Sequence, residues 1–207
     1  MTPVPRLLSA DDVANFRGRL CEAAERLFVE EGPDAVTMRQ LAAELGCSPM
    51  TPYRYFKDKG EILAAVRASA FDRLSDALDQ AFGQVHANHP RPRSQAAGRA
   101  YAQFALAQPE AYRLMFDLMQ PGEAAYPGLM RATERARVTI VHHLSGAAAG
   151  ADPGPSARVV GHCHWAALHG ALMLHLADKL GPGVAVTELI EGLMTVGDQF
   201  AADSVDA

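Results

Sequence analysis

The sequence predicts an all-α protein, and three observations support that fold class. Apolar residues recur at three- and four-residue spacing from Val13 to Phe200, which is the period of helices with one buried face. Alternating apolar and polar runs, which are typical of strands, are nearly absent. Clusters of proline and glycine divide the chain into segments of helical length. With 207 residues, 49% of them hydrophobic, the chain can bury a real core in one or two domains.

The first two helices are expected at the start of the chain. Asp11 or Asp12 can cap a first helix that ends where Gly32 supplies a stop. Its apolar face consists of Phe16, Leu20, Ala24, Leu27 and Phe28. Thr37 then caps the segment "MRQLAAEL", which Gly46 closes.

A short third helix and a long fourth helix are expected next. Ser48 is the expected cap of the third helix, with Pro49 at its first position, where a missing N–H costs nothing. Pro52 falls one turn later and should tighten or distort this helix. Asp58 is the expected cap of a long helix from Lys59 toward Val85.

The remaining helices are separated by Pro- and Gly-containing connectors. We expect them at about Gln95–Ala107, Pro109–Met119, Pro127–Leu144, Ala157–Leu180 and Val186–Ala201.

Composition restricts the classes of function. The formal net charge of −5 argues against a general affinity for nucleic acid, so any polyanion contact requires a local basic patch. The opening residues "MTPVPRLLSADDV" lack the apolar run of a signal peptide, and no segment has the ~20 apolar residues of a membrane helix, which predicts a cytoplasmic protein. The three cysteines are odd in number and far apart, which favours reduced, buried thiols.

The stretch "SPMTPYRYFKDK" provides such a basic patch. Two short helices around a turn containing Gly46 indicate a helix-turn-helix, whose second helix enters the DNA major groove. The residues expected inside are Met38, Leu41, Ala42, Leu45 and Phe56; those left for a partner are Arg39, Thr51, Tyr53, Arg54, Tyr55, Lys57 and Lys59. Pro49, Met50 and Thr51 stand where base edges would be contacted. The alternative is an ordinary helical hairpin with a solvated basic rim.

The segment "TMRQLAAELGCSPMTPYRYFKDKGEIL" resembles the signature of TetR-type transcriptional regulators. The matching positions are Thr37, Ala42, Gly46, Ser48, Tyr53, Tyr55, Phe56 and Lys59. The resemblance implies DNA contacts, chiefly to phosphates, from Thr37, Arg39, Thr51, Tyr53, Arg54, Tyr55 and Lys59, with Pro49 and Met50 near bases. Two positions depart from the pattern: Pro52 replaces an aliphatic residue, and Gly60 replaces an acidic one.

The same resemblance implies a division into two domains. A three-helix helix-turn-helix DNA-binding domain is expected over residues 1–58, with the start of the linking helix to about residue 63. A helical ligand-binding and dimerisation domain is expected over 59–207. The fragments "QPEAYRLMF" and "CHWAALHGALML" are similar to the TetR subgroup with a Trp, His-Gly pattern, here Trp165, His169 and Gly170.

The last two expected helices carry a pattern typical of a helix–helix interface. One has small and apolar residues spaced by four and three, namely Val159, Cys163, Ala166, Gly170, Met173, Ala177 and Leu180. The other repeats the spacing with Val186, Leu189, Leu193, Val196 and Phe200. Together they predict a four-helix bundle with a second copy, and the alternative is a contact within one chain.

A second group of residues predicts an effector site. Its members are Tyr101, Phe104, Tyr112, Met115, Phe116, Met119, Trp165 and Leu172, with His162, His169 or a tyrosine hydroxyl to orient a mainly apolar ligand. For each of these residues alone, core packing is the competing interpretation. Four histidines, His162, His164, His169 and His175, lie on one expected helix, but no carboxylate stands between Asp152 and Asp178, so no metal site is expected.

The leading hypothesis is a ligand-responsive transcriptional regulator, most simply a repressor. It would act as a homodimer on a palindromic operator in double-stranded DNA, without a cofactor and without a membrane partner. One alternative is a small helical enzyme that uses His169 with a tyrosine or Cys163, although no motif supplies a complete catalytic set. Another is a helical adaptor whose basic rim binds an acidic protein.

Overall fold

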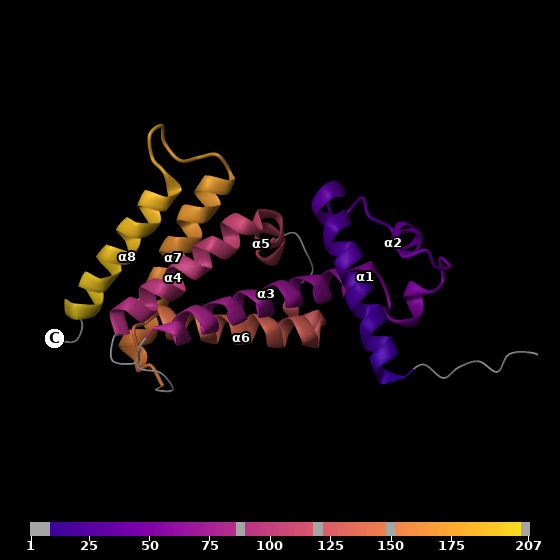
Figure 1. Cartoon of the computed structure of the whole chain (residues 1–207), viewed down its shortest axis with the longest axis horizontal. Helices are drawn as coiled ribbons and strands as arrows, with labels where there is room; N and C mark the ends of the chain where they lie inside the picture. Colours follow the sequence, from indigo (N-terminus) through magenta and orange to yellow (C-terminus); the bar gives the residue numbers. More distant parts are fainter. Residues whose placement is uncertain (1–8, 86–89, 118–121, 148–151, 204–207) are drawn as a thin grey trace, which may run out of the picture. The chain divides into compact units, whose positions relative to one another are not determined.

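The computed structural model describes residues 9–85, 90–117, 122–147 and 152–203. Within these ranges the chain is all-α: eight α-helices and two short 3-10 helices are present, and no strand is formed (Figure 1). None of the helices in the described ranges combines the length and apolarity needed to cross a membrane. The elements in chain order are α1 (Ala10–Glu31), α2 (Met38–Glu44), η1 (Pro52–Arg54), α3 (Lys59–Gln84), α4 (Pro90–Ala107), α5 (Pro109–Met115), η2 (Glu123–Ala125), α6 (Pro127–Leu144), α7 (Pro155–Leu176) and α8 (Val186–Asp203).

The chain forms two compact units. Unit 1 comprises Met1–Ser69 and Asp117–Met130, and unit 2 comprises Ala70–Phe116 and Arg131–Ala207. Helices α3 and α6 therefore each contribute residues to both units. The domain boundary expected at residue 58 stays a prediction.

In unit 1, α1 begins with a different cap from the one expected. Ser9 is the N-cap: its side chain accepts a hydrogen bond from the Asp12 N–H at 3.1 Å, and the Asp12 carboxylate accepts one from the Ser9 N–H at 3.0 Å. The prediction of Asp11 or Asp12 as the cap is wrong because this reciprocal pair satisfies two N–H groups at once. The helix ends at Gly32, whose φ of 83° only glycine adopts readily.

Helix α2 forms as predicted. Thr37 and Gln40 make a capping box at its start, and Gly46, with φ of 63°, follows its end. The expected inner residues Met38, Leu41, Ala42 and Phe56 are buried, whereas Leu45 is half-buried. These side chains fix α2 and the following segment against α1, whose Leu20, Ala24 and Phe28 are also buried.

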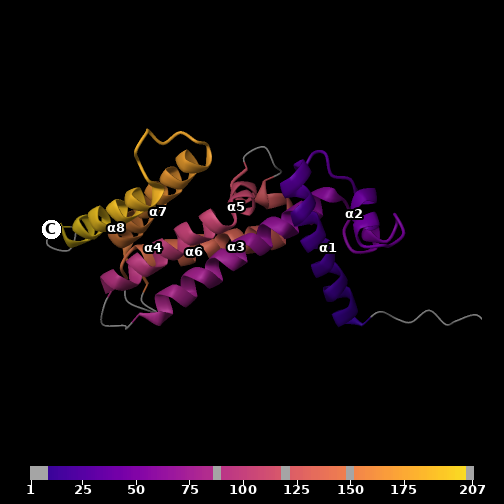
Figure 2. The same cartoon turned by 45° about the horizontal axis from the view of Figure 1, so that its top comes forward.

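In unit 2, α7 packs along both α8 and α4, as the two views of the ribbon show (Figure 2). Two glycines permit close approaches. A Cβ at Gly161 of α7 would overlap the Val141 carbonyl oxygen of α6, and a Cβ at Gly98 of α4 would overlap the Met194 sulfur of α8. Small residues therefore set the distances between these helices.

Three helix boundaries in unit 2 differ from expectation. Helix α4 begins at Pro90, five residues before the expected start, because prolines are tolerated in a first turn. Helix α5 ends at Met115 instead of Met119, which lies outside the described residues. Helix α7 ends at Leu176 instead of Leu180, because Asp178 has φ of 55° and the Lys179 N–H bonds back to the Leu174 carbonyl at 2.8 Å.

Candidate DNA-binding surface and effector site

The expected recognition helix is not an α-helix in this structure. A tight turn, in which the Thr51 N–H bonds to the Ser48 carbonyl at 2.8 Å, leads into the 3-10 helix η1. The expected cap at Ser48 is wrong, because η1 has Thr51 at its N-cap position, but the expectation that Pro52 tightens this helix is confirmed, since Pro52 has no N–H. In an α-helix the Ser48 carbonyl would accept from residue 52, so the bond from Thr51 takes its place.

This turn and η1, residues 48–54, together with Tyr55 and Phe56, form what we call the recognition segment. Within this segment the side chains of Pro52 and Phe56 are buried. The Arg17 guanidinium of α1 lies 3.9 Å from the centre of the Phe56 ring and donates a hydrogen bond to the Tyr55 carbonyl. The rings of Phe16 and Tyr55 stack at 4.2 Å. Contacts of Arg17 and Phe16 with Tyr55 and Phe56 thus hold the segment against α1.

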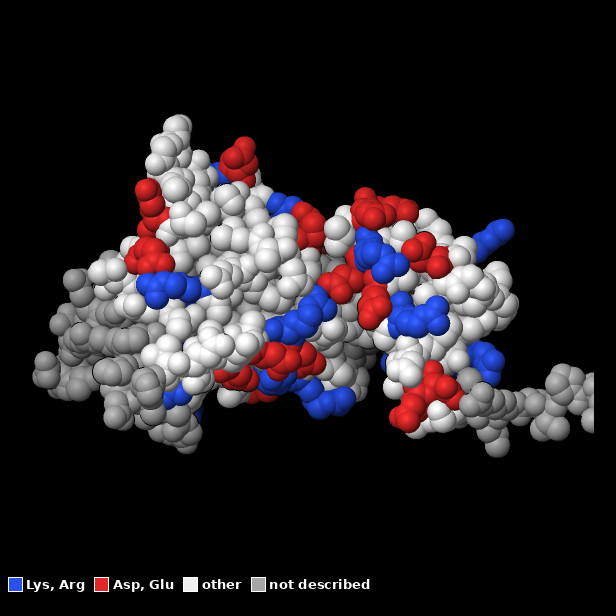
Figure 3. Space-filling model, in the orientation of Figure 1, with Lys and Arg blue, Asp and Glu red and all other residues white. Residues whose placement is uncertain are grey.

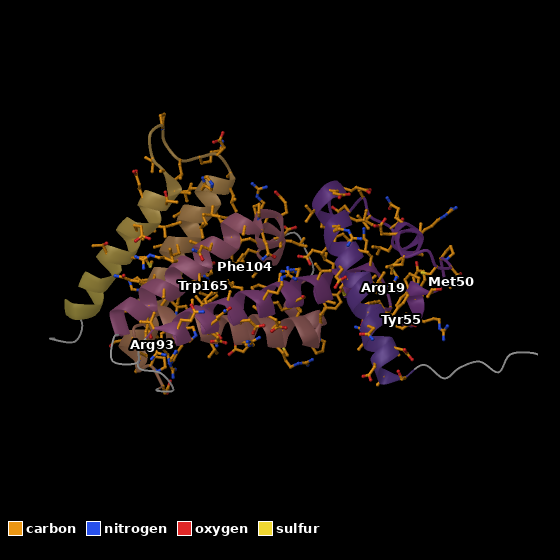
Figure 4. The ribbon with its side chains drawn as sticks, in the orientation of Figure 1. Arg19, Met50, Tyr55, Arg93, Phe104 and Trp165 are labelled. Atoms are coloured by element: carbon orange, nitrogen blue, oxygen red, sulfur yellow. The ribbon has the colours of Figure 1, made fainter. Side chains whose placement is uncertain are left out.

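The outer side of the recognition segment exposes large side chains. Met50 is 67% exposed, Tyr53 is 48% exposed, and Pro49 and Arg54 are also exposed. Arg39 of α2 is exposed as well. Figure 4 labels Met50 and Tyr55 on this segment, and Figure 3 shows that both acidic and basic side chains lie on the visible face of unit 1. The recognition segment therefore exposes polar, basic and apolar side chains, while its buried Pro52 and Phe56 hold the backbone in place.

Two other predicted DNA contacts are partly occupied within the chain, and a third is half-buried. The Thr37 hydroxyl accepts from the Gln40 N–H at 3.2 Å and donates to the Gln40 side-chain oxygen at 2.9 Å. The Lys59 ammonium donates to the Pro33 carbonyl at 2.6 Å and to the Asp34 carbonyl at 3.0 Å, which leaves one of its three donors for a phosphate. Thr51 is half-buried. The DNA contacts of all nine residues stay predictions.

In unit 2, four predicted effector residues form a hydrogen-bonded chain. The Trp165 Nε1–H donates to the Tyr101 hydroxyl oxygen at 2.9 Å. The Tyr101 and Tyr112 hydroxyls lie 2.8 Å apart, and the Tyr112 hydroxyl lies 2.6 Å from Nδ1 of His169. Tyr101 and Tyr112 are buried, whereas Trp165 and His169 are half-buried. We call these four residues the polar chain; helices α4, α5 and α7 supply them.

Aromatic rings surround the polar chain. The Phe116 ring lies 4.4 Å from the His169 ring and 5.1 Å from the Tyr112 ring, centre to centre. Phe71 of α3, which was not among the expected effector residues, contacts Phe116 edge-on at 5.6 Å. Met115, Phe104 and Leu172 are buried, as core residues would also be. Figure 4 labels Phe104 and Trp165 of this group.

His162 does not join this group. Its Nδ1 pairs with the Arg158 carbonyl at 2.8 Å on the exposed side of α7, and its ring lies 6.3 Å from that of Trp165. Its proposed part in orienting an effector therefore has less support than that of His169.

Burial controls the protonation of the polar chain. It raises the pKa of the Tyr101 and Tyr112 phenols well above their ordinary range, so both remain hydroxyls. It lowers the pKa of His169, which favours the uncharged imidazole.

Comparison with known proteins is consistent with this geometry. The model for "Bacterial regulatory proteins, tetR family" matches residues 20–66, and the model for "Tetracyclin repressor-like, C-terminal domain" matches residues 94–196. Together the two models cover most of the chain. The chain belongs to the TetR family.

Individual relatives of this TetR-family chain agree on the fold. A protein of unknown function from Rhodococcus sp. RHA1 is 29% identical, with a TM-score of 0.74 over 97% of this chain and 98% of that one. The TetR-family transcriptional regulator PfmR from Thermus thermophilus is 20% identical, with a TM-score of 0.58 over 89% and 97%. An HTH-type transcriptional regulator of Staphylococcus aureus (strain USA300) is 35% identical over 78 residues, which are 38% of this chain and only 42% of that relative.

The expected dimer face of this TetR-family chain lies on the exposed side of α7. We call Val159, Cys163, Ala166, Gly170, Met173 and Ala177 the α7 seam. Val159 is 63% exposed, Cys163, Ala166 and Ala177 are exposed, and a Cβ on Gly170 would have no atom within 4 Å. Leu189 and Leu193 of α8 are half-buried, and the side chains of Val196 and Phe200 lie outside the described residues. Leu180 stands beyond the end of α7.

The arrangement offers little for metal or nucleophilic chemistry in the part of the chain that is described. No group of three or more His, Cys, Asp or Glu residues there could hold a metal ion. His169 pairs with tyrosine hydroxyls, and neither an acid nor Cys163 is among its hydrogen-bond partners in those ranges. Cys163 instead stands on the exposed α7 seam.

Arg17 and Phe71 are site residues that sequence reasoning missed. Arg17 directly follows Phe16 on the predicted apolar face of α1, and a basic residue at the edge of such a face is a weak signal of contact with a neighbouring segment. Phe71 lies in the middle of α3 with the periodicity of an ordinary core residue, so no local signal distinguishes it.

Proposed function

We propose that this protein is a ligand-responsive transcriptional repressor that binds operator DNA through the recognition segment. The single observation that supports this most is the combination of exposed Met50, Tyr53 and Arg54 with buried Pro52 and Phe56 in the same segment. Because the buried residues fix the backbone of the segment before binding, less conformational entropy is lost on binding. Exposed Arg and Tyr side chains can bind phosphates and base edges. Because its partner is DNA, we propose that the protein acts in the cytoplasm.

We propose that two copies associate through the α7 seam. The opposite face of α7 is buried within the chain through Gly161, Leu168, Ala171 and Leu172, so the exposed seam is free for a partner. Its small side chains would let a second helix approach closely. A two-fold dimer carries two equal recognition segments, and its operator is therefore expected to be an inverted repeat with half-sites ~34 Å apart.

We propose that a small, mainly apolar effector binds beside the polar chain and weakens operator binding. Phe116 contacts His169 on one side and Phe71 of α3 on the other. Helix α3 is continuous into unit 1, to which its first residues belong. An effector that displaces Phe116 therefore has a route to the helix that follows the recognition segment. A typical coupling free energy of about 1–3 kcal/mol would weaken operator binding about 5- to 150-fold.

The test is operator affinity in matched variants. Tyr53→Ala and Arg54→Ala should each weaken binding about 5- to 10-fold, the equivalent of about 1 kcal/mol, without loss of helical content. Arg54→Ala should also reduce the salt dependence of binding by about one ion per protomer. Val29→Ala, at an exposed apolar position on α1, is the control and should change neither quantity. Unchanged affinity in both test variants would refute the proposal, and binding to an acidic protein without DNA sequence preference would favour the adaptor instead.

A further inference from the structure

The hydrogen bonds of the polar chain all run in one direction, from donor to acceptor, and Trp165 determines that direction. The Trp165 indole nitrogen is a donor only, so the Tyr101 oxygen must accept the 2.9 Å hydrogen bond. The Tyr101 hydroxyl proton must then find its own acceptor, and the Tyr112 oxygen at 2.8 Å is the nearest. The Tyr112 proton can in turn go only to Nδ1 of His169, at 2.6 Å. In this arrangement each proton of the two buried hydroxyls has an acceptor.

The opposite arrangement leaves one buried proton without an acceptor. If Nδ1 of His169 carried a proton, it would donate to the Tyr112 oxygen. The two phenol oxygens would then be the only acceptors for four donors: the Trp165 indole, His169 and both hydroxyls. One hydroxyl would then point at no acceptor among the described residues, although both tyrosines are fully buried. An unsatisfied buried donor costs about 1–3 kcal/mol. The Tyr101 hydroxyl also lies 3.4 Å from Nδ1, a contact that either tautomer allows.

The neutral His169 ring therefore carries its proton on Nε2. That atom has no hydrogen-bond partner in the described parts of the chain. It is also not sealed from solvent, in contrast to Nε2 of His164, which is buried without a partner. His169 thus presents one unused N–H donor on a ring that lies 4.4 Å from the half-buried Phe116 ring, which in turn lies 6.5 Å from the half-buried Trp165 ring.

No charged side chain is among the hydrogen-bond partners that the described residues give the polar chain. The hydrogen-bond partners of the polar chain in the described ranges are its own four members. Burial is the cause of the lowered pKa of His169. A buried anion would lack a counter-ion here, and a cation would meet a donor where it needs an acceptor.

We propose that the Nε2–H of His169 is a fixed donor that selects effectors with an uncharged acceptor, such as the carbonyl of a ketone, ester or amide, on an apolar body. This proposal rests on the proposed function, because it names the ligand class of the proposed effector site. Trp165, Tyr101 and Tyr112 are then positioning residues that keep the imidazole in one tautomer.

The tautomer is tested without any effector or DNA. Nitrogen-15 NMR of the histidine side chains, with His169 assigned by comparison with His169→Gln, should show Nδ1 as the unprotonated nitrogen and Nε2 as the protonated one at neutral pH. In Tyr101→Phe, which removes the middle hydroxyl, the Nδ1-protonated form should become detectable. A proton on Nδ1 in the unaltered protein would overturn the proposal.

Ligand preference is tested with three probes that share one ring. Trp165 is the only tryptophan of the chain, so its fluorescence reports binding beside the polar chain directly. Cyclohexyl methyl ketone should bind at least about tenfold more tightly than cyclohexanecarboxylate or cyclohexylmethylammonium. His169→Gln, which keeps an N–H donor, should bind the ketone within about threefold of the unaltered protein, and His169→Leu should lose about 3- to 10-fold.

The outcomes separate this proposal from the proposed function. Equal or tighter binding of the ammonium, absence of ketone binding, or equal ketone affinity in His169→Leu would each overturn the donor assignment. Each of these results leaves operator binding unaffected. Conversely, failure to bind any operator would refute the proposed function, while the tautomer and the ketone preference would still be measured.

Discussion

Removal of the Arg17 guanidinium should destabilise unit 1 by an amount that its contacts define. Arg17→Met keeps the aliphatic stem and deletes three interactions. The cation–π contact with Phe56 at 3.9 Å is worth about 0.5–1 kcal/mol at a partly exposed site. The charge-assisted hydrogen bond to the Tyr55 carbonyl is worth about 1.5 kcal/mol. The ion pair with Glu61 at 3.9 Å joins side chains that are 39% and 38% exposed, so water screens it to about 0–0.5 kcal/mol.

These contributions sum to a predicted loss of about 2–3 kcal/mol in the free energy of unfolding for Arg17→Met. The matched control is Arg19→Met, because Arg19 is on the same helix, is exposed, and has no hydrogen-bond or ion-pair partner in the described ranges. Urea unfolding followed by circular dichroism measures both variants, and the control should stay within about 0.5 kcal/mol of the unaltered protein. Equal stability of the two variants would refute the reasoning that Arg17 holds the recognition segment.

Three further predictions follow from other contacts. Gly161→Ala should lower stability by about 1–3 kcal/mol in thermal or urea unfolding, because its Cβ would meet the Val141 carbonyl, whereas Gly83→Ala, with open space around its Cβ, should not. Burial lowers the pKa of His143 from 6.5; His142 and Arg93 lower it further, and Asp79 opposes the shift. The unfolded chain therefore binds more protons than the folded one, so the free energy of unfolding should fall as the pH drops below about 6.5. Urea unfolding at several pH values should show a weaker pH dependence for His143→Gln. Ala166→Glu on the α7 seam should convert the proposed dimer to monomer in sedimentation velocity, with helical content retained; a variant that stays dimeric would contradict the seam as the interface.

The fold could be predicted from the sequence where one local signal dominates. Thr37 with Gln40 three residues later and Gly46 after the helix leave α2 few alternatives. The prediction of helix boundaries failed where several local signals compete or where none is present. Ser9, Asp11 and Asp12 can all cap a helix, and only the reciprocal bonds of Ser9 and Asp12 decide between them. Asp178 ends α7 without a glycine to indicate it.

The candidate site was predictable as a group of residues but not as a geometry. Aromatic and histidine positions on separate helices indicated that Tyr101, Tyr112, Trp165 and His169 could meet, and the structure brings them within hydrogen-bond distance. The order of donors and acceptors depends on distances between three helices, which no local pattern encodes. For the same reason the sequence could not show that the Lys59 ammonium bonds to the carbonyls after α1.

The most direct test of the central claim is selection of bound sequences from a random pool of DNA duplexes with the purified protein at near-physiological salt. We expect enrichment of an inverted repeat whose half-sites are about one helical turn apart, ~34 Å, and loss of that enrichment with Arg54→Ala. Failure of the folded protein to enrich any sequence, or equal enrichment with Arg54→Ala, would contradict a DNA-binding role for the recognition segment.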